Sequence, residues 1–282
     1  MIKIICLTGF WGIITIILLV PIENNYLSLI DFVIYLLSNY EGLINHLWYM
    51  GALICIYIFF PLLKITFDSN KKIFVYFTII CAILTFGNVF IGNCASMMLN
   101  VFKLHNGIVS SNFFSIFNPF RGINGYTFVY FCVGGLAYEL KEKIEKINKK
   151  KRILTATSIL VFSCLGLFIT GILLSNISGM IWDVVWYGYD TIFTFINVVM
   201  IFVLCLSYKG ENKLIRSISS NTLGIYFMHV IFIRLTNKYV VQIPIIATFF
   251  GCIVYAFIIM IICLIITKLL LKIPLLKELV KL

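Results

Sequence analysis

The side chains best suited to acid–base chemistry in this sequence are its three histidines, and two of them lie in apolar stretches. His229 lies within SSNTLGIYFMHVIFIRL (Ser219–Leu235), and His46 is the second residue of NHLWYMGALICIYIFFPLLK (Asn45–Lys64). A neutral imidazole can accept the proton of a reacting hydroxyl, which is the usual task of a general base. Ionisable residues within apolar spans usually face a bundle interior or a water-filled cavity, so both histidines are candidates for a functional site.

The residues around His229 predict a polar stripe along a helix. Ser219, Thr222, Tyr226 and His229 are 3, 4 and 3 positions apart, which places them on one helix face. In a functional interpretation the stripe lines a cavity, with His229 as proton acceptor or as hydrogen-bond donor to a substrate. In a structural interpretation the same side chains join neighbouring helices, for about 0.6–2 kcal/mol each. The spacing is compatible with both.

Two further candidates lie where membrane surfaces are expected. His46 precedes Trp48 and Tyr49, and these aromatic residues also fit the belt at a membrane–water interface, where an imidazole is simply hydrated. The connection Asn93–Gly122 is longer than a link between two helices requires, and such loops often carry function. Within it, Arg121 either binds an anionic group of a substrate or lies among lipid headgroups.

Composition indicates the environment in which these side chains act. The chain is 62% hydrophobic and 12% charged, and its apolar residues form long blocks. Barrel strands would alternate over about 10 residues, and no such period is apparent, so backbone hydrogen bonding in lipid leaves a helical bundle. We therefore predict an all-α, polytopic transmembrane bundle, organised as a single domain over residues 1–282. Eight spans are expected, at Ile4–Val20, His46–Leu63, Ile73–Gly92, Ile123–Tyr138, Ile153–Leu174, Thr191–Tyr208, Ser219–Leu235 and Ile245–Thr267.

The distribution of lysine and arginine predicts the orientation of these spans. If Met1 is cytoplasmic, all but four of the 22 Lys and Arg residues fall in cytoplasmic segments, as the positive-inside rule requires. Both termini and the segment Lys141–Arg152 are therefore expected in the cytoplasm. The net charge of +11 follows from this topology and from contact with anionic lipid, so nucleic acid is not an expected partner.

Motifs of soluble enzymes are absent from the sequence. It contains no P-loop, no GxSxG and no HExxH. The nine cysteines are scattered without a CxxC pair, so neither a metal site nor a disulfide framework is expected. The first 25 residues lack a small-x-small cleavage site and are interpreted as a retained helix. Gly134 and Gly135 are expected to allow close helix packing.

Three segments together resemble the acyltransferase 3 family of integral membrane proteins. Asn45–Lys64 resembles the family's His–Leu–Trp–aromatic segment, and GYTFVYFCVGGLAYEL (Gly125–Leu140) resembles its Phe–x–x–Gly–Gly helix. SSNTLGIYFMHVIF, from Ser219, is similar to its Leu–Gly–Ile–Tyr–x–x–His helix. The segments occur in the family's order, and the resemblance extends over essentially the whole chain.

The resemblance implies transfer of an acyl group, commonly acetyl, from a cytoplasmic thioester such as acetyl-CoA. The implied acceptor is a hydroxyl of a glycan or lipid-linked sugar outside a bacterial plasma membrane, so the implied role is O-acetylation of a cell-envelope polysaccharide. Membrane lipid is an expected partner, and no metal is implied. Combined with the polar stripe and the long outer loop, this gives an expected site with His46 and His229 as catalytic residues, and Trp48, Arg121, Thr222 and Tyr226 as substrate-binding residues.

The beginning of the chain departs from the family's pattern. Family members usually start with a helix that carries an Arg and then the favoured catalytic histidine, whereas the first span here resembles a later helix of the family. The chain is therefore expected to lack the family's first two helices. Two alternatives stay open, an inactive truncated relative and a transporter or flippase of glycan intermediates. The transporter is disfavoured because no acidic residue lies deep within a span to couple ions.

Overall fold

The computed structural model describes residues 1–22, 28, 33, 42–109, 113–120, 122–180, 188–208, 210–240, 242–274 and 276–281. Within these ranges the regular structure is helical throughout, and no strand occurs. The prediction of an all-α protein is thereby confirmed. The chain divides into two compact units, one made of Met1–Ile58 and Glu211–Leu282, the other of Phe59–Gly210. We call them the terminal unit and the central unit, and the single domain stays a prediction.

Five helical segments in the described ranges are long and apolar enough to cross a membrane. They are α1 (Ile2–Leu19), α3 with the turn before it (Ile44–Ser69), α4 continued through α5 (Lys71–Val101), α8 (Lys149–Ser178) and α12 (Phe249–Lys272). A sixth is the pair α10 (Lys213–Ser220) and α11 (Thr222–Val240), bent by 78°. The other two predicted spans coincide with α7 (Ile123–Lys146), whose last turns are charged, and α9 (Ile192–Cys205), which has 14 residues. The polytopic helical bundle is confirmed, and the count of eight stays a prediction.

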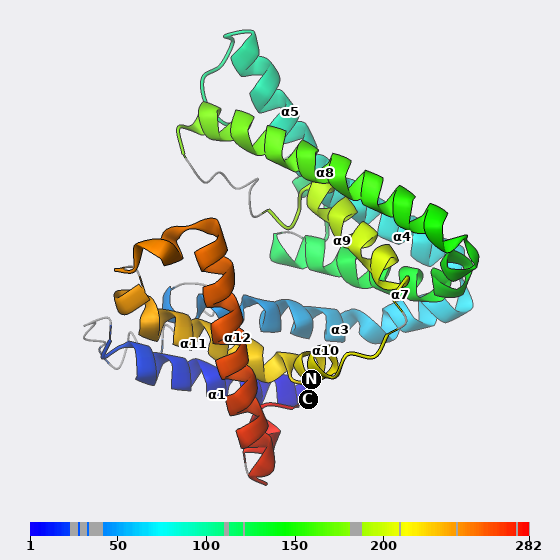
Figure 1. Cartoon of the computed structure of the whole chain (residues 1–282). Helices are drawn as coiled ribbons and strands as arrows, with labels where there is room; N and C mark the ends of the chain where they lie inside the picture. Colours follow the sequence, from blue (N-terminus) through cyan, green and yellow to red (C-terminus); the bar gives the residue numbers. More distant parts are fainter. Residues whose placement is uncertain are drawn as a thin grey trace. The chain divides into compact units, whose positions relative to one another are not determined.

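The terminal unit is built around α1 and α11, which lie side by side and run in the same direction, with α12 crossing α11 (Figure 1). Trp11 of α1 stacks on Phe227 of α11, with ring centroids 5.3 Å apart and planes at 7°. Where α11 meets α12, a methyl group on Gly224 would lie 2.5 Å from Thr267 Cγ2. A glycine is therefore needed for this crossing. By contrast, a methyl group on Gly134 would meet no described atom within 4 Å, and one on Gly135 would meet Phe67 Cε2 only at 4.0 Å, so among the described residues neither glycine is needed for close helix packing.

The two ends of the chain meet within the terminal unit. Lys3 Nζ lies 2.8 Å from Glu278 Oε2, and the Trp11 indole N–H donates to the carbonyl oxygen of Leu279 at 2.8 Å. Val280 is buried beside them. Both ends therefore lie on one face of this unit, as they must if they share one side of a membrane. That this side is the cytoplasm stays a prediction.

The central unit contains α4 (Lys71–Ala82), a π-helical turn and α5 (Asn88–Val101) in one continuous run, together with α7, α8 and α9. Phe120 and Phe128 stack in its core, with ring centroids 4.1 Å apart. At one end, the buried Arg152 donates through Nε to Ser207 Oγ at 3.0 Å and through Nη1 to the Ile144 carbonyl oxygen at 2.9 Å. These bonds join the ends of α7 and α9 to the start of α8.

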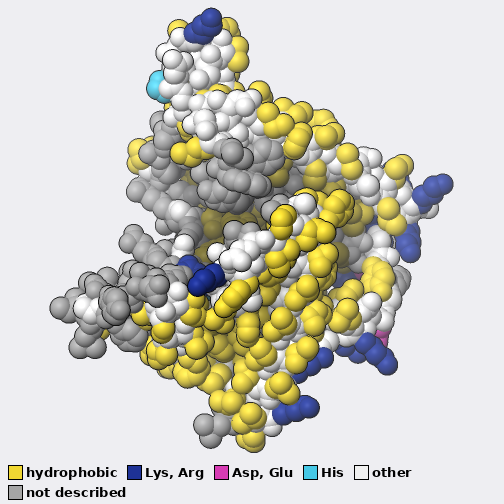
Figure 2. Space-filling model, turned by 60° about the vertical axis from the view of Figure 1, so that its left-hand side comes forward, with side chains coloured by type: hydrophobic (Ala, Val, Ile, Leu, Met, Phe, Trp, Pro, Cys, Tyr) yellow, Lys and Arg dark blue, Asp and Glu magenta, His cyan; other side chains and the backbone are white. Residues whose placement is uncertain are grey.

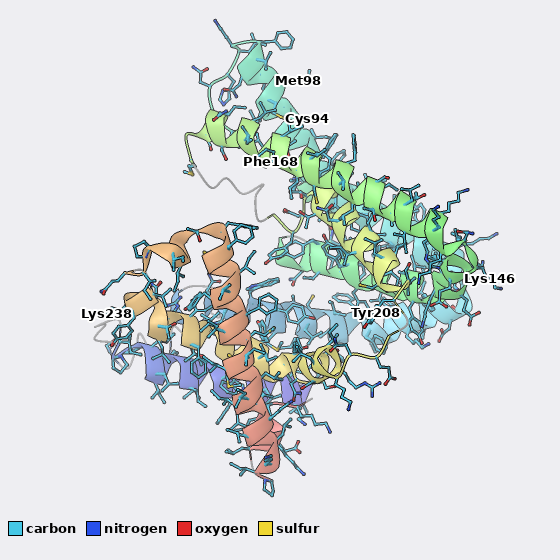
Figure 3. The ribbon with its side chains drawn as sticks, in the orientation of Figure 1. Cys94, Met98, Lys146, Phe168, Tyr208 and Lys238 are labelled. Atoms are coloured by element: carbon cyan, nitrogen blue, oxygen red, sulfur yellow. The ribbon has the colours of Figure 1, made fainter. Side chains whose placement is uncertain are left out.

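Hydrophobic side chains cover much of the described surface on the face shown, and most of the lysines and arginines in view lie near its edges (Figure 2). Along the central unit, Lys146 and Tyr208 lie at one end, and Cys94 and Met98 lie at the other (Figure 3). This pattern of apolar flanks and charged ends is what a lipid-exposed protein requires. It agrees with the charge pattern from which the orientation was predicted.

Candidate functional site

The terminal unit brings His46 and His229 together. Their ring centroids are 6.2 Å apart, with the planes at 88°. His46 comes from a single 3₁₀ turn (Gly42–Leu47) that leads into α3 (Trp48–Ser69), and His229 comes from the middle of α11. We call these two residues the histidine pair. Their proximity is a tertiary contact that no local pattern of the sequence contains.

The turn that carries His46 is fixed by its apolar residues. Ile44 and Leu47 of this 3₁₀ segment, and Met50 in the first turn of α3, are all at most 1% exposed. A 3₁₀ helix has about three residues per turn, so residues three apart lie on one face. This face is buried in the core of the unit. Asn45 is exposed on another side. The His46 ring therefore has a defined direction, set by the residues before and after it.

Tyr226 connects the two histidines. Its hydroxyl donates to the carbonyl oxygen of His46 at 2.5 Å, and its own carbonyl oxygen lies 2.6 Å from His229 Nδ1. A carbonyl oxygen can only accept, so in the neutral ring His229 Nδ1 carries the proton and Nε2 keeps a basic lone pair. Tyr226 thus fixes both the position of the His46 turn and the tautomer of His229.

The two ring nitrogens of His46 are inaccessible to solvent and have no hydrogen-bond partner among the described residues. An unsatisfied buried polar group costs about 1–3 kcal/mol, so proteins seldom keep one without a use. A neutral imidazole has one donor and one acceptor nitrogen. His46 is therefore equipped to donate to and accept from a ligand hydroxyl that reaches it.

Aromatic rings border the histidine pair. The ring of Tyr226 lies 5.9 Å from that of His229 and 5.8 Å from that of Tyr49. Trp48 packs edge-on against Tyr49 at 6.0 Å. Trp48, a predicted substrate-binding residue, therefore belongs to the same cluster, whereas Tyr49 was not among the predicted site residues. Its exposed ring follows the motif directly, so the aromatic pair after the histidine was the signal that could have identified it.

The predicted polar stripe is interrupted. Thr222 is exposed, and its hydroxyl donates to the carbonyl oxygens of Ile218 and Ser219 at 3.2 and 2.9 Å. Ser219 belongs to α10, which is separated from α11 by a bend of 78° at Asn221. The Asn221 amide donates to the Ser217 carbonyl oxygen at 2.6 Å, which is how asparagine competes with helix continuation. The stripe prediction was wrong for Ser219 because it assumed one unbroken helix.

Arg121 lies outside the residues that the structure describes. Among the residues that it describes, no group of three or more His, Cys, Asp and Glu side chains could hold a metal ion. Cavities of about 50 to 450 Å³ are lined by other, mainly apolar residues. The site is therefore defined by the polar geometry of the histidine pair.

The sequence of the whole chain was compared with those of known proteins. The family model described as an acyltransferase domain matches residues 1–268. The chain therefore belongs to the acyltransferase 3 family, as its motifs predicted, and is an integral membrane acyltransferase. No curated protein and no solved structure matches it.

Proposed function

We propose that this protein transfers an acyl group, with acetyl as the first candidate, from a cytoplasmic acyl-CoA thioester to a hydroxyl of an extracytoplasmic glycan. The observation that supports this proposal most directly is the histidine pair, with the tautomer of His229 fixed by Tyr226. Acyl transfer to a hydroxyl needs a base because a neutral hydroxyl is a weak nucleophile. Family membership favours this function over the transporter alternative.

In the proposed reaction His229 Nε2 accepts the proton of the acceptor hydroxyl while the hydroxyl oxygen attacks the thioester carbonyl carbon. A C–O bond forms, and the carbonyl electrons move to oxygen. The tetrahedral intermediate then collapses, the C–S bond breaks, and the leaving thiolate takes the proton from the His229 imidazolium. The products are the glycan ester and the free thiol, so His229 returns to its initial state without any net change in protons.

His46 has a second role in this proposal. Its one ring N–H, inaccessible to solvent, donates to the acceptor oxygen or to the developing oxyanion, which is the kind of preorganised contact that lowers the energy of a transition state. Arg234 of α11 is close enough to His46 for an electrostatic interaction, so its fixed positive charge favours an anionic intermediate. The base is thus supplied by α11, and the orienting group by the turn before α3.

The proposed setting is a bacterial plasma membrane, with lipid around the helices and a glycan or lipid-linked sugar as acceptor. A donor from inside and an acceptor outside require a reaction centre within the membrane rather than on a soluble surface. The apolar surroundings of the histidine pair support this requirement. They also exclude water, which would otherwise compete with the sugar hydroxyl for the thioester.

The test uses the protein in proteoliposomes with radiolabelled acetyl-CoA and the source strain's own surface glycan, de-O-acylated by mild alkali. His229→Gln should reduce kcat by at least about 10²-fold, the lower end of the range for a general base. His105→Gln is the matched control, because His105 is exposed in the central unit, and it should behave like the wild type. Transfer by His229→Gln at near the wild-type rate, with equal folded protein, would assign His229 to structure.

A further inference from the structure

Three tyrosines and an aspartate gather at one end of the central unit. Tyr126 and Tyr130 lie in the first two turns of α7, and Tyr189 and Asp190 directly precede the cap of α9. The Tyr130 hydroxyl donates to the Tyr189 carbonyl oxygen at 3.0 Å. The rings of Tyr126 and Tyr189 are 5.8 Å apart with their planes at 30°. We call these four residues the tyrosine–aspartate cluster.

The cluster has a rigid side and an open side. The Tyr130 ring packs against Phe86 at 5.8 Å and Phe195 at 5.7 Å, and these two phenylalanines lie 4.8 Å from each other. Tyr189, in contrast, is 54% exposed. The exposed Tyr189 ring therefore lies next to a well-packed aromatic core of Tyr130, Phe86 and Phe195.

Asp190 has a carboxylate without a salt-bridge partner among the described residues. It is half-buried, and burial raises its pKa above the usual value of 3.8, partly offset by its own backbone N–H. The α9 helix does not need it as a cap, because Thr191 Oγ1 accepts from the Thr194 N–H at 3.2 Å. At the start of α9 the helix dipole favours a carboxylate, but the described residues provide no cation to pair with it.

The arrangement suits one class of ligand better than others. A sugar has an apolar C–H face, against which an aromatic ring can pack. Its hydroxyls can donate strong, charge-assisted hydrogen bonds to a carboxylate. A divalent cation would need more oxygen ligands than one aspartate supplies. An ammonium ion is usually held in a cage of several rings, but here Tyr130 is covered by phenylalanines and the Tyr126 and Tyr189 rings are nearly parallel. The cluster combines an exposed aromatic ring with a half-buried carboxylate from the adjacent residue.

The position along α7 gives the side of the membrane. Tyr126 and Lys146 lie 20 residues apart in one helix, which corresponds to about 30 Å. Lys146 marks the lysine-rich end of the central unit (Figure 3), and lysine-rich ends face the cytoplasm. The tyrosine–aspartate cluster therefore belongs to the outer side, where the proposed acceptor is found.

We infer that the tyrosine–aspartate cluster binds a sugar residue of the acceptor glycan. The Tyr189 ring packs against the face of the sugar, and the Asp190 carboxylate accepts hydrogen bonds from the sugar hydroxyls. The identification of this sugar as the acceptor rests on the proposed function. Neither Tyr189 nor Asp190 takes part in bond making. Both act on the binding of the acceptor, so their removal changes KM for the glycan rather than kcat.

The kinetic test compares four variants in the proteoliposome assay, with the de-O-acylated glycan as varied substrate. Asp190→Asn and Tyr189→Leu should each raise KM for the glycan about tenfold, as expected for loss of a hydrogen bond to a charged group or of a stacked ring. Tyr189→Phe keeps the ring and should raise KM by less than Tyr189→Leu does. Tyr138→Leu, the control, should match the wild type, because Tyr138 is 74% exposed and lies further along α7, towards Lys146. An unchanged KM in Asp190→Asn and Tyr189→Leu would overturn the inference.

Two more measurements separate this inference from the proposed function and from a structural role. Equilibrium binding of the de-O-acylated glycan to solubilised protein should weaken in Asp190→Asn even if no acyl transfer occurs. This result would support the sugar-binding site even if the proposed acyl transfer were wrong. Tetramethylammonium binding without glycan binding would instead indicate a cation cage and overturn the site. Finally, because the buried carboxylate is costly when ionised, Asp190→Asn should raise Tm at neutral pH. A lower Tm would assign Asp190 to the stability of α9.

Discussion

The histidine pair of the terminal unit and the tyrosine–aspartate cluster of the central unit present polar groups in opposite ways. The nitrogens of His46 are closed off from solvent, and the tautomer of His229 is set by a backbone carbonyl. In the tyrosine–aspartate cluster, Tyr189 is largely exposed and the Asp190 carboxylate is only half-buried. Proton transfer needs fixed geometry and little water, whereas recognition of a large ligand needs an accessible surface. The difference agrees with the proposed roles, chemistry at the histidine pair and binding at the tyrosine–aspartate cluster.

The sharpest way to break this comparison is to remove both histidines. His229→Gln and His46→Gln should each reduce kcat, by at least about 10²-fold for His229. Because the rings are 6.2 Å apart and are proposed to act on one transition state, the double variant should lose little more than His229→Gln alone. The measurement is a double-mutant cycle on kcat with saturating glycan. Fully multiplicative losses would show that the two residues act independently.

The next effect in size is expected at Tyr226. Tyr226→Phe removes only the hydroxyl that donates to the His46 carbonyl oxygen and leaves the backbone contact with His229 intact. Loss of one hydrogen bond of this kind corresponds to about 0.5–1.5 kcal/mol, and we expect a decrease in kcat of about threefold to tenfold. KM for the glycan should stay unchanged. A rise in KM without a change in kcat would instead support direct contact of Tyr226 with the substrate.

The sequence was sufficient to locate most of the helices. Each predicted span overlaps a helix, because lipid demands a minimum apolar length whatever the tertiary structure, but several helices run further than predicted, such as α5, which ends at Val101 rather than at Gly92. N-cap side chains also indicate where several helices begin. One example is Asn212, whose side chain accepts hydrogen bonds from the backbone N–H groups of Leu214 and Ile215. Histidines within such stretches were recognisable as candidates because polarity there is costly.

The sequence could not show how these elements meet. The contact of His46 with His229 depends on a turn whose direction is set by buried Ile44 and Leu47. The bend at Asn221 removes Ser219 from the polar stripe that helical spacing had predicted. The tyrosine–aspartate cluster joins two segments far apart in the chain, and it was not predicted because its residues form no motif within either segment. In each case the missing information is tertiary.

Thr222 tests whether the interrupted stripe still contributes to the site. Its hydroxyl is satisfied by carbonyl oxygens of the preceding turn, so Thr222→Ala should leave kcat and KM for the glycan within about twofold of the wild type. Exposed substitutions of this type usually change stability by less than about 0.5 kcal/mol. The assay is the same kinetic comparison, with Tyr226→Phe measured in parallel. A tenfold loss in Thr222→Ala would restore the predicted stripe as part of the substrate site.

The smallest effect is expected where the two ends of the chain meet, outside both sites. The hydrogen bond and the charge of Lys3 lower the pKa of Glu278 below its usual value of 4.5. A carboxylate with a lowered pKa contributes stability that is present above about pH 4.5 and is lost as the pH falls through the folded-state pKa. Because the pair is exposed, the contribution should be small and screened by salt.

Glu278→Gln should therefore lower Tm slightly at pH 7 in low salt and should make no difference once the pH is well below the lowered pKa of Glu278, where the wild-type carboxyl is also protonated. Lys3→Gln should reproduce the loss at pH 7, and the double variant should add nothing, because either change removes the same ion pair. Kinetic constants should be unchanged in all three variants. A Tm difference that persists at a pH well below that pKa would show that Glu278 stabilises the terminal unit by packing rather than by charge.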